Sequence, residues 1–233
     1  IRKAGLGMLI RPASLSVNLL SGLFFLYHEH IYAPLGNPVI IPASTSITIL
    51  FVPLYSSILT SMPVNINEIN KEILNYGEEN ENSKGLGTTV VAAIVTKDFL
   101  IFANIGDSSG YVIKNNKLHK VTKPHTLVNL LVSTGELTEE EAKYHPRKNV
   151  LMRALGANNP IEADIFDVDT SVKGIFLCSD GLTNMITNEQ IEKVLNGKLD
   201  IEEKVVRLIR KSNSRGGTDN ISIAYMQTES GDF

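Results

Sequence analysis

The sequence has only one cysteine among its 233 residues and little excess charge of either sign. A lone cysteine, Cys178, excludes a disulfide framework and favours a reducing compartment, the cytoplasm. A formal net charge of -3 provides no global field that would attract nucleic acid or an acidic membrane surface. With 43% hydrophobic and 20% charged residues, the composition is typical of a globular chain.

Aspartate is absent from residues 1–62, and Glu29 is the only acidic residue there. All the other acidic residues follow from Glu68 onward. Two apolar runs occupy the acid-poor part, and the second, 39–59, is long enough to cross a bilayer although prolines, serines and threonines interrupt it. We therefore expect an atypical apolar segment of unknown structure over 1–62 and a separate domain over 63–233, with membrane association through 39–59 as an unfavoured alternative.

The second part of the sequence alternates helical and strand patterns. Apolar residues at helical spacing predict a helix over 64–80, and two β-branched runs predict hairpins over 88–105 and 110–122. Capping signals predict three more helices, and apolar runs predict two later strands; these elements lie at 137–146, 187–196 and 200–212, and at 174–179 and 221–226. Strands in meander order with helices before and after them indicate an α+β fold with antiparallel sheets.

Three aspartates stand where predicted strands begin or end: Asp107, Asp180 and Asp219. Each alone is an ordinary turn residue. If the strands are neighbours, however, the three carboxylates converge on one rim and repel one another, and a hard divalent cation such as Mg²⁺ or Mn²⁺ would relieve that repulsion. The five histidines are scattered without zinc-site spacing, and the sequence motifs of nucleotide-binding loops and serine hydrolases are absent.

Five stretches together resemble one family, the metal-dependent Ser/Thr protein phosphatases of type 2C in their bacterial form. They are "KGLGTTVVAAIV", "ANIGDSSGYVI", "TKPHTLVNLLVSTGELTEEEAKYHPRKNVLMRALG", "IFLCSDGLTNMI" and "GGTDNISIAYM". The resemblance implies a four-layer sandwich of two antiparallel sheets flanked by helices, and hydrolysis of phosphoserine and phosphothreonine with two or three Mn²⁺ or Mg²⁺ ions. The fold is expected to be incomplete at the N-terminus.

The same resemblance implies roles for individual residues. Asp180 and Asp219 would be catalytic-site metal ligands, Asp107 and Asp180 would hold a third ion, and Asn220 would orient a ligand. Residues 124–147 match a flap beside the active site that meets the protein substrate. The flap residues singled out are His125, Asn129, His145 and Arg147.

Departures from the family pattern concentrate in the first part of the chain. Residues 1–62 lack the phosphate-binding arginine, the Asn-x-Asp segment and the Asp-Gly-Met-Gly-Gly-His-type turn whose aspartate bridges two metals. Ser109 replaces a usual arginine, and Pro124 a usual aspartate. Three explanations remain open: aberrant coding of 1–62; a degenerate relative that binds without turnover; or a genuine N-terminus that is membrane-associated or recruits Glu29 or His30.

The expected function is metal-dependent dephosphorylation of Ser/Thr residues in phosphoproteins, impaired by the missing bridging aspartate. The expected partners are phosphoprotein substrates and an opposing Ser/Thr kinase, with no nucleic acid, and the expected state is a cytoplasmic monomer. The alternatives are a non-catalytic pseudophosphatase that binds phosphoproteins, and the membrane-associated protein described above.

Overall fold

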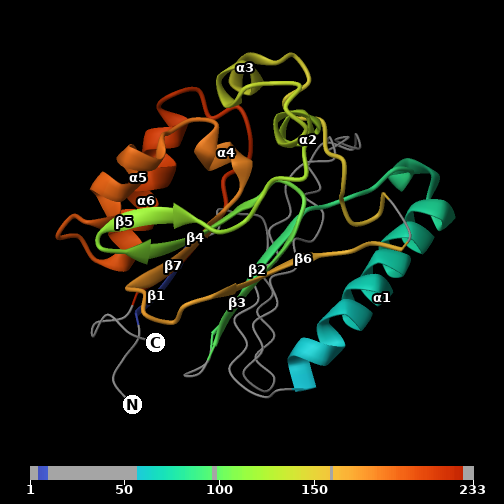
Figure 1. Ribbon diagram of the computed structural model, residues 1–233, viewed down its shortest axis with the longest axis horizontal. Coiled ribbons are helices and arrows are strands. Elements are labelled where there is room, and N and C mark those ends of the chain that lie inside the picture. Colours follow the sequence, from blue (N-terminus) through green and yellow to red (C-terminus); the bar gives the residue numbers. More distant parts are fainter. Residues whose placement is uncertain (1–4, 10–56, 96–98, 158–159, 228–233) are drawn as a thin grey trace, which may run out of the picture.

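The computed structural model describes residues 5–9, 57–95, 99–157 and 160–227, and these form two antiparallel sheets flanked by helices (Figure 1). One sheet has the strand order β1-β8-β7-β4-β5 and the other the order β2-β3-β6. The strands of the first sheet are β1 (Gly5–Leu9), β8 (Ile223–Gln227), β7 (Gly174–Cys178), β4 (Ser109–Lys114) and β5 (Lys117–Lys120). Those of the second are β2 (Val90–Val95), β3 (Leu100–Ile105) and β6 (Asp164–Val168). The expected fold class is confirmed.

The two sheets pack face to face through one apolar layer. Val91 and Phe102 from the second sheet share a buried cluster with Ile175, Leu177 and Ala224 from the first. All six residues of β3 are buried, and five of them are apolar, the exception being Asn104. Because both faces of β3 are buried, the strand is held firmly and the position of its ends is fixed. The turn that follows it carries Asp107.

Helices cover the outer face of each sheet. On the five-stranded sheet lie α4 (Asp180–Thr183), α5 (Asn188–Leu195) and α6 (Ile201–Asn213), whose apolar faces enclose Phe176, Cys178 and Tyr225. Beyond the three-stranded sheet lies α1 (Ser57–Glu79), which packs Ile66 and Ile73 against a smaller cluster (Figure 1). Cys178 is completely buried within the larger cluster, as its apolar surroundings in the sequence predict.

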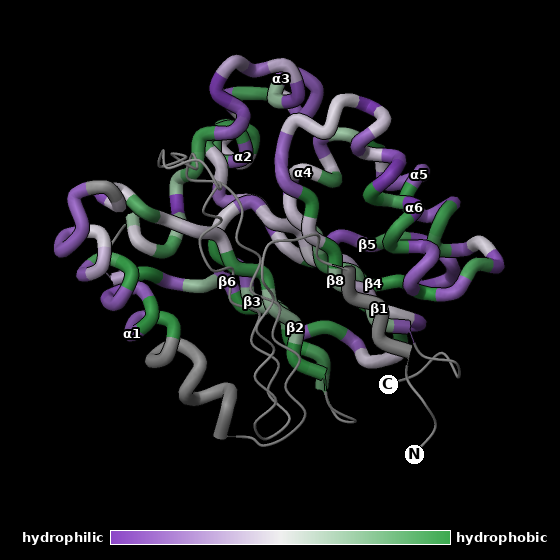
Figure 2. The backbone as a smooth tube through the Cα atoms, turned by 180° about the vertical axis from the view of Figure 1, so that it is seen from behind, coloured by the Kyte–Doolittle hydropathy of each residue, from purple (hydrophilic) through white to green (hydrophobic). Residues whose placement is uncertain are grey.

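Two short helices, α2 (Leu127–Ser133) and α3 (Glu139–Tyr144), project beyond one end of the sheets (Figure 1). Figure 2 shows that α3 and the loops around it are mostly hydrophilic, whereas β2 and β3 are mostly hydrophobic. Every residue of α3 is exposed or half-buried. The segment that carries α2 and α3, here called the excursion, is therefore held at its base and by the capping of its helices rather than by burial.

The local signals in the sequence are largely confirmed. Capping boxes begin α3 at Thr138 and α5 at Thr187, and Asp200 caps α6. The predicted hairpin tip has Asn115 and Asn116 at φ values of 52° and 62°, in the left-handed region that asparagine tolerates.

Some elements were not predicted from the sequence: strand β6 and the short helices α2 and α4. Helix α1 begins at Ser57, and β1 lies within the segment whose structure was left open. The expected domain boundary after residue 62 stays a prediction. Among the described residues, none of the helices is long and apolar enough to cross a membrane. Residues 39–56, most of the apolar run considered for membrane association, lie outside the described residues.

Candidate active site

The end of β7 and the segment before β8 are joined by hydrogen bonds from Ser179. Its N–H donates to the carbonyl oxygen of Ser222 at 3.0 Å, and its hydroxyl donates to the carbonyl oxygen of Asn220 at 3.1 Å. The hydroxyl oxygen also accepts from the N–H of Ser222 at 3.1 Å. Asp180 follows Ser179 and Asp219 precedes Asn220, so this clasp brings the two aspartates to the same rim.

Glycine at position 181 allows the two backbones to approach this closely. A Cβ placed on Gly181 would collide with the carbonyl oxygen of Asn220 and crowd the carbonyl carbon of the same residue. The turn after β7 therefore needs glycine for its lack of a side chain, not for an unusual φ. This explains why an apolar strand ends in the sequence Ser-Asp-Gly.

Asp107 lies on the turn between β3 and β4, which is also built around a glycine. Gly106 has a φ of 106°, and a Cβ there would collide with the side chain of Thr89. The hydroxyl of Thr89 shares a hydrogen bond of 2.9 Å with that of Ser108, on the other side of Asp107. The carboxylate is thus presented from a tightly constrained turn.

The three carboxylates interact electrostatically. Burial, followed by the charges of Asp180 and Asp219, raises the pKa of Asp107 to about 6, and Lys120 only partly opposes that rise. Burial and the charge of Asp219 likewise raise the pKa of Asp180. The three aspartates are therefore near enough to affect one another's pKa, and their expected role as metal ligands stays a prediction.

The donor chemistry of this rim suits Mg²⁺ or Mn²⁺, because both prefer carboxylate oxygens and a cation would relieve the repulsion between the aspartates. The number of donors falls short, however: within the described ranges, no group of three or more His, Cys, Asp or Glu side chains is arranged to hold a metal ion. A complete coordination shell would need additional ligands.

Two asparagines contact the aspartates. The side-chain amide of Asn184 donates to Oδ2 of Asp180 at 3.1 Å, a contact that the sequence did not reveal. The backbone N–H of Asn220 donates to Oδ1 of Asp219 at 2.7 Å, while the Asn220 residue itself is exposed. The role expected for Asn220 in orienting a ligand stays a prediction.

His125, expected in the flap, makes its main contacts with the turn that carries Asp107. Its backbone N–H donates to the carbonyl oxygen of Gly106 at 2.8 Å, and its ring Nδ1 accepts from the Gly106 N–H at 3.0 Å. Nε2 lies 3.2 Å from Oδ2 of Asp164. Since Nδ1 is an acceptor, the neutral ring carries its proton on Nε2 and donates it to Asp164.

Arg153 holds the other oxygen of the same carboxylate. Its Nη1 donates to Oδ1 of Asp164 at 2.7 Å and to the carbonyl oxygen of Glu162 at 3.1 Å. Burial would raise the pKa of Asp164, but hydrogen bonds from His125 and Arg153 outweigh it and lower that pKa. Burial, reinforced by the charge of Arg153, lowers the pKa of His125 despite the hydrogen bond to Asp164.

The other three expected flap residues contact only their own segments in the bonds that the structure gives. The N–H of Asn129 donates to the capping hydroxyl of Thr126 at 3.3 Å, and Nδ1 of His145 accepts from the N–H of Arg147 at 3.2 Å. Arg147 is exposed. Their roles toward a substrate stay predictions.

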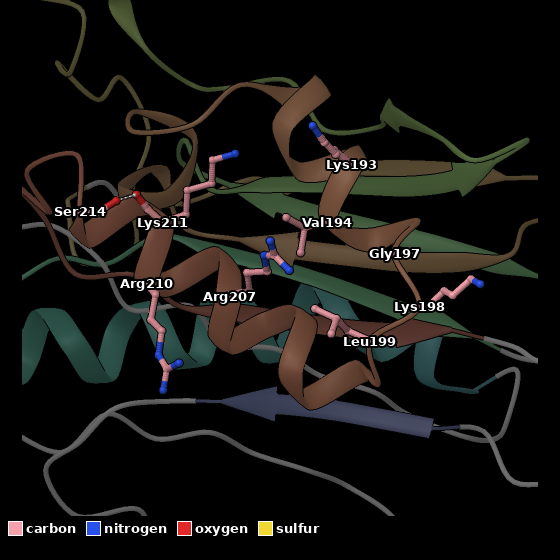
Figure 3. A pocket seen from close by; sticks show the side chains of 9 residues that line it. All are labelled: Lys193, Val194, Gly197, Lys198, Leu199, Arg207, Arg210, Lys211 and Ser214. Atoms are coloured by element: carbon pink, nitrogen blue, oxygen red, sulfur yellow. Dashed lines mark hydrogen bonds between the residues drawn. The ribbon is translucent and has the colours of Figure 1, made fainter.

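A groove between α5 and α6 contains none of the three aspartates (Figure 3). Figure 3 shows its cationic side chains ending in different directions, Arg210 pointing away from Lys193 and Lys198. The groove is therefore a basic surface rather than a site converging on one ligand. Its lining cations are Lys193, Lys198, Arg207, Arg210 and Lys211.

Comparison with known proteins identifies a family and individual relatives that this chain resembles. A family model described as protein phosphatase 2C matches residues 53–221. The serine/threonine phosphatase stp of Listeria welshimeri is 45% identical over 163 residues, covering 70% of this chain and 65% of that protein. The corresponding Listeria monocytogenes protein is 44% identical over 165 residues, covering 70% and 66%. The chain thus spans just under two thirds of the length of these relatives.

Solved structures agree in fold. The serine/threonine phosphatase of S. agalactiae has a TM-score of 0.70 and 38% identity, covering 76% of this chain and 73% of that one. The Mycobacterium tuberculosis serine/threonine phosphatase PstP/Ppp has a TM-score of 0.69 and 25% identity, covering 97% of each chain.

Proposed function

Since this chain belongs to the protein phosphatase 2C family, we propose that it hydrolyses phosphoserine and phosphothreonine in proteins, with impaired turnover. The observation that supports the proposal is the electrostatic coupling of Asp107, Asp180 and Asp219: beside burial, the charges of the other aspartates raise the pKa of the first two. Carboxylates crowded in this way favour a bound divalent cation. The proposal extends to this chain the activity named for relatives that it matches over only part of their length.

Asp180 and Asp219 would hold Mn²⁺ or Mg²⁺ at the catalytic position, and Asp107 with Asp180 a further ion. When bound, such ions supply a nucleophilic water at neutral pH and neutralise charge on the transferring phosphoryl group. The chain's own contribution is positional: Asn184 orients Asp180, and the Ser179 clasp keeps the β7 end against the segment that carries Asp219.

The ligand count supports impaired turnover. The described residues offer no group of three side chains arranged for a metal, and residues 1–62 contain no aspartate that could bridge two ions. The same observation favours a second candidate, a pseudophosphatase that binds phosphoproteins without hydrolysing them. In either case the expected partners are phosphoproteins and an opposing Ser/Thr kinase. The expected state is a monomer in the cytoplasm, a reducing compartment that is compatible with a single buried cysteine.

The test is hydrolysis of an aryl phosphate with and without millimolar Mn²⁺, by the unaltered chain and by Asp180→Asn. We expect slow, Mn²⁺-dependent hydrolysis that the substitution reduces on the order of 100-fold or more, because metal-based stabilisation of charge is worth several kcal/mol. Asp167→Asn, which removes an exposed carboxylate on β6, is the matched control and should retain activity. Folded protein that binds a phosphoserine peptide without turnover would instead establish the pseudophosphatase.

A further inference from the structure

His125 joins two parts of the molecule that are far apart in sequence. Its carbonyl oxygen accepts from the N–H of Met152 at 2.8 Å, and beside it the N–H of Leu127 donates to the carbonyl oxygen of Val150 at 2.9 Å. These bonds close the base of the excursion that carries α2 and α3. The N–H and the ring of His125 bind Gly106 instead. One residue therefore connects the base of the excursion to the turn that presents Asp107.

The connection depends on which ring nitrogen carries the proton. The Gly106 N–H can only donate, so the bond of 3.0 Å exists only while Nδ1 is unprotonated. Nε2 lies 3.2 Å from Oδ2 of Asp164 and 3.4 Å from Nη1 of Arg153. Because Nδ1 accepts from Gly106, the single proton of the neutral ring is on Nε2, where it donates to Asp164 and prevents Nε2 from accepting from Arg153. Arg153 keeps Asp164 ionised and in place through Oδ1. The three side chains thus form a chain of donors and acceptors that ends on the Gly106 amide.

We propose that His125 is a positioning residue, held as its Nε2–H tautomer by Asp164 and Arg153, that fixes the Gly106–Ser108 turn so that Asp107 faces the other two aspartates. This role deepens the proposed function and rests on it where metal binding is concerned. Groups that orient metal ligands in this indirect way typically change metal affinity or activity by about 10–100-fold when altered.

Asp164→Asn tests the tautomer without touching the ring or the turn. An amide has one acceptor oxygen where a carboxylate has two, so Arg153 and His125 compete for it. Arg153 has only donors and a full charge, so it should win and leave the amide N–H group facing Nε2. The imidazole must then accept there and carry its proton on Nδ1, where it opposes the Gly106 N–H.

The first measurement is by NMR on ¹⁵N-labelled protein. A coupling across the hydrogen bond between the Gly106 nitrogen and Nδ1 of His125 should be present in the unaltered chain and lost in Asp164→Asn. Asp167→Asn makes the same charge change on the same strand and should keep the coupling. A proton found on Nδ1 in the unaltered chain, or a coupling that survives Asp164→Asn, would overturn the proposal.

The second measurement follows paramagnetic broadening of the Gly106 amide signal during Mn²⁺ titration, which needs no turnover. Asp164→Asn should require at least about 10-fold more Mn²⁺ to reach the same broadening, whereas the Mn²⁺ dependence of Asp167→Asn should equal that of the unaltered chain. Equal Mn²⁺ dependence despite a lost coupling would overturn the positioning role. Absence of broadening even in the unaltered chain would overturn the metal site of the proposed function, while the coupling would still decide how His125 holds the turn.

Discussion

At the scale of single residues, close backbone contacts position the acidic side chains. Gly181 provides the clearest case, because its place against Asn220 is closed to any side chain although its φ is ordinary. Gly135, after α2, shows the opposite situation: it has a φ of 79° and nothing near a hypothetical Cβ. Gly181 is required because a side chain would not fit, whereas Gly135 is required because its backbone adopts a positive φ.

Alanine at each glycine should therefore give different results. Gly181→Ala should destabilise by about 1–3 kcal/mol through overpacking and lower Mn²⁺-dependent hydrolysis or Mn²⁺ affinity, because Asp180 and Asp219 are pushed apart. Gly135→Ala should cost about 1–2 kcal/mol of backbone strain and leave metal dependence unchanged. Urea titration and Mn²⁺ titration of both variants check this. Identical Mn²⁺ dependence in the two would contradict the steric account.

A pH effect on stability belongs to the same scale. The pKa of His125 is lowered, chiefly by burial, so as pH falls below its ordinary value of 6.5 the unfolded chain takes up a proton before the folded one does. Stability should decline as pH falls from 6.5 toward the folded-state pKa. The decline arises because the unfolded chain gains a proton that His125 in the folded chain, buried and beside Arg153, resists taking up.

The measurement compares urea unfolding at pH 7.5 and pH 5.5 for the unaltered chain and for His125→Gln. The loss of stability between the two pH values should be smaller in the variant, even if the variant is weaker at both. His119→Gln, on an exposed residue of β5, is the control and should behave as the unaltered chain does. An equal pH effect in His125→Gln would contradict the assignment.

At the scale of elements, helices and strands marked by patterns of adjacent residues were predicted, whereas features that depend on contacts between distant residues were not. Capping boxes, hairpin tips and apolar runs each occupy a few adjacent residues, and these elements were predicted correctly. Strand β6 was missed because its burial alternates between half-buried and exposed, and two of its five residues are aspartates. Asp164 and Arg153 were missed with it, because their importance comes from contacts with His125 across the fold.

The three aspartates were predicted together only because strand-end carboxylates and family motifs coincided. Their meeting depends on the strand order of the five-stranded sheet, which places β7 between β4 and β8. No local pattern specifies that order. One signal in the sequence was not used. Asn104 is an isolated polar residue within an apolar run, and its side-chain amide donates to the carbonyl oxygens of Gly106 and Lys123.

The capping boxes of α3 and α5 predict unequal effects of the same substitution. Thr138→Ala should unfold α3 locally at a cost of about 1 kcal/mol, because all of its residues are exposed or half-buried. Thr187→Ala should lower global stability by a similar amount, because α5 buries Ile191, Val194 and Leu195. Amide hydrogen exchange should show loss of protection confined to α3 in the first variant. Loss of protection throughout the sheets in Thr138→Ala would contradict this distinction.

At the scale of the whole molecule, the five-stranded sheet ends on one side in β1, an edge strand that lies against α6. This strand pairs antiparallel with β8 from Gly5 opposite Gln227 to Leu9 opposite Ile223. Without β1, the outward backbone groups of β8 would form an open edge that another chain can extend. A segment outside the five quoted motifs thus completes the sheet that carries Asp180.

Removal of residues 1–9 should therefore promote self-association, whereas removal of residues 1–4 alone should not. Analytical ultracentrifugation of both truncated chains at several concentrations measures this. A monodisperse monomer after removal of 1–9, at concentrations where the unaltered chain is also monomeric, would show that β1 is dispensable for protecting the edge.

The buried thiol of Cys178 offers a consequence for experiment. Burial raises its pKa to about 12, and the side chain is wholly inaccessible, so an alkylating reagent can reach it only when the core opens. Because the sequence has no second thiol, the rate of alkylation, measured by mass spectrometry as a single mass shift, reports how often the core opens. Thr187→Ala and Gly181→Ala should increase the alkylation rate, and Thr138→Ala should leave it unchanged.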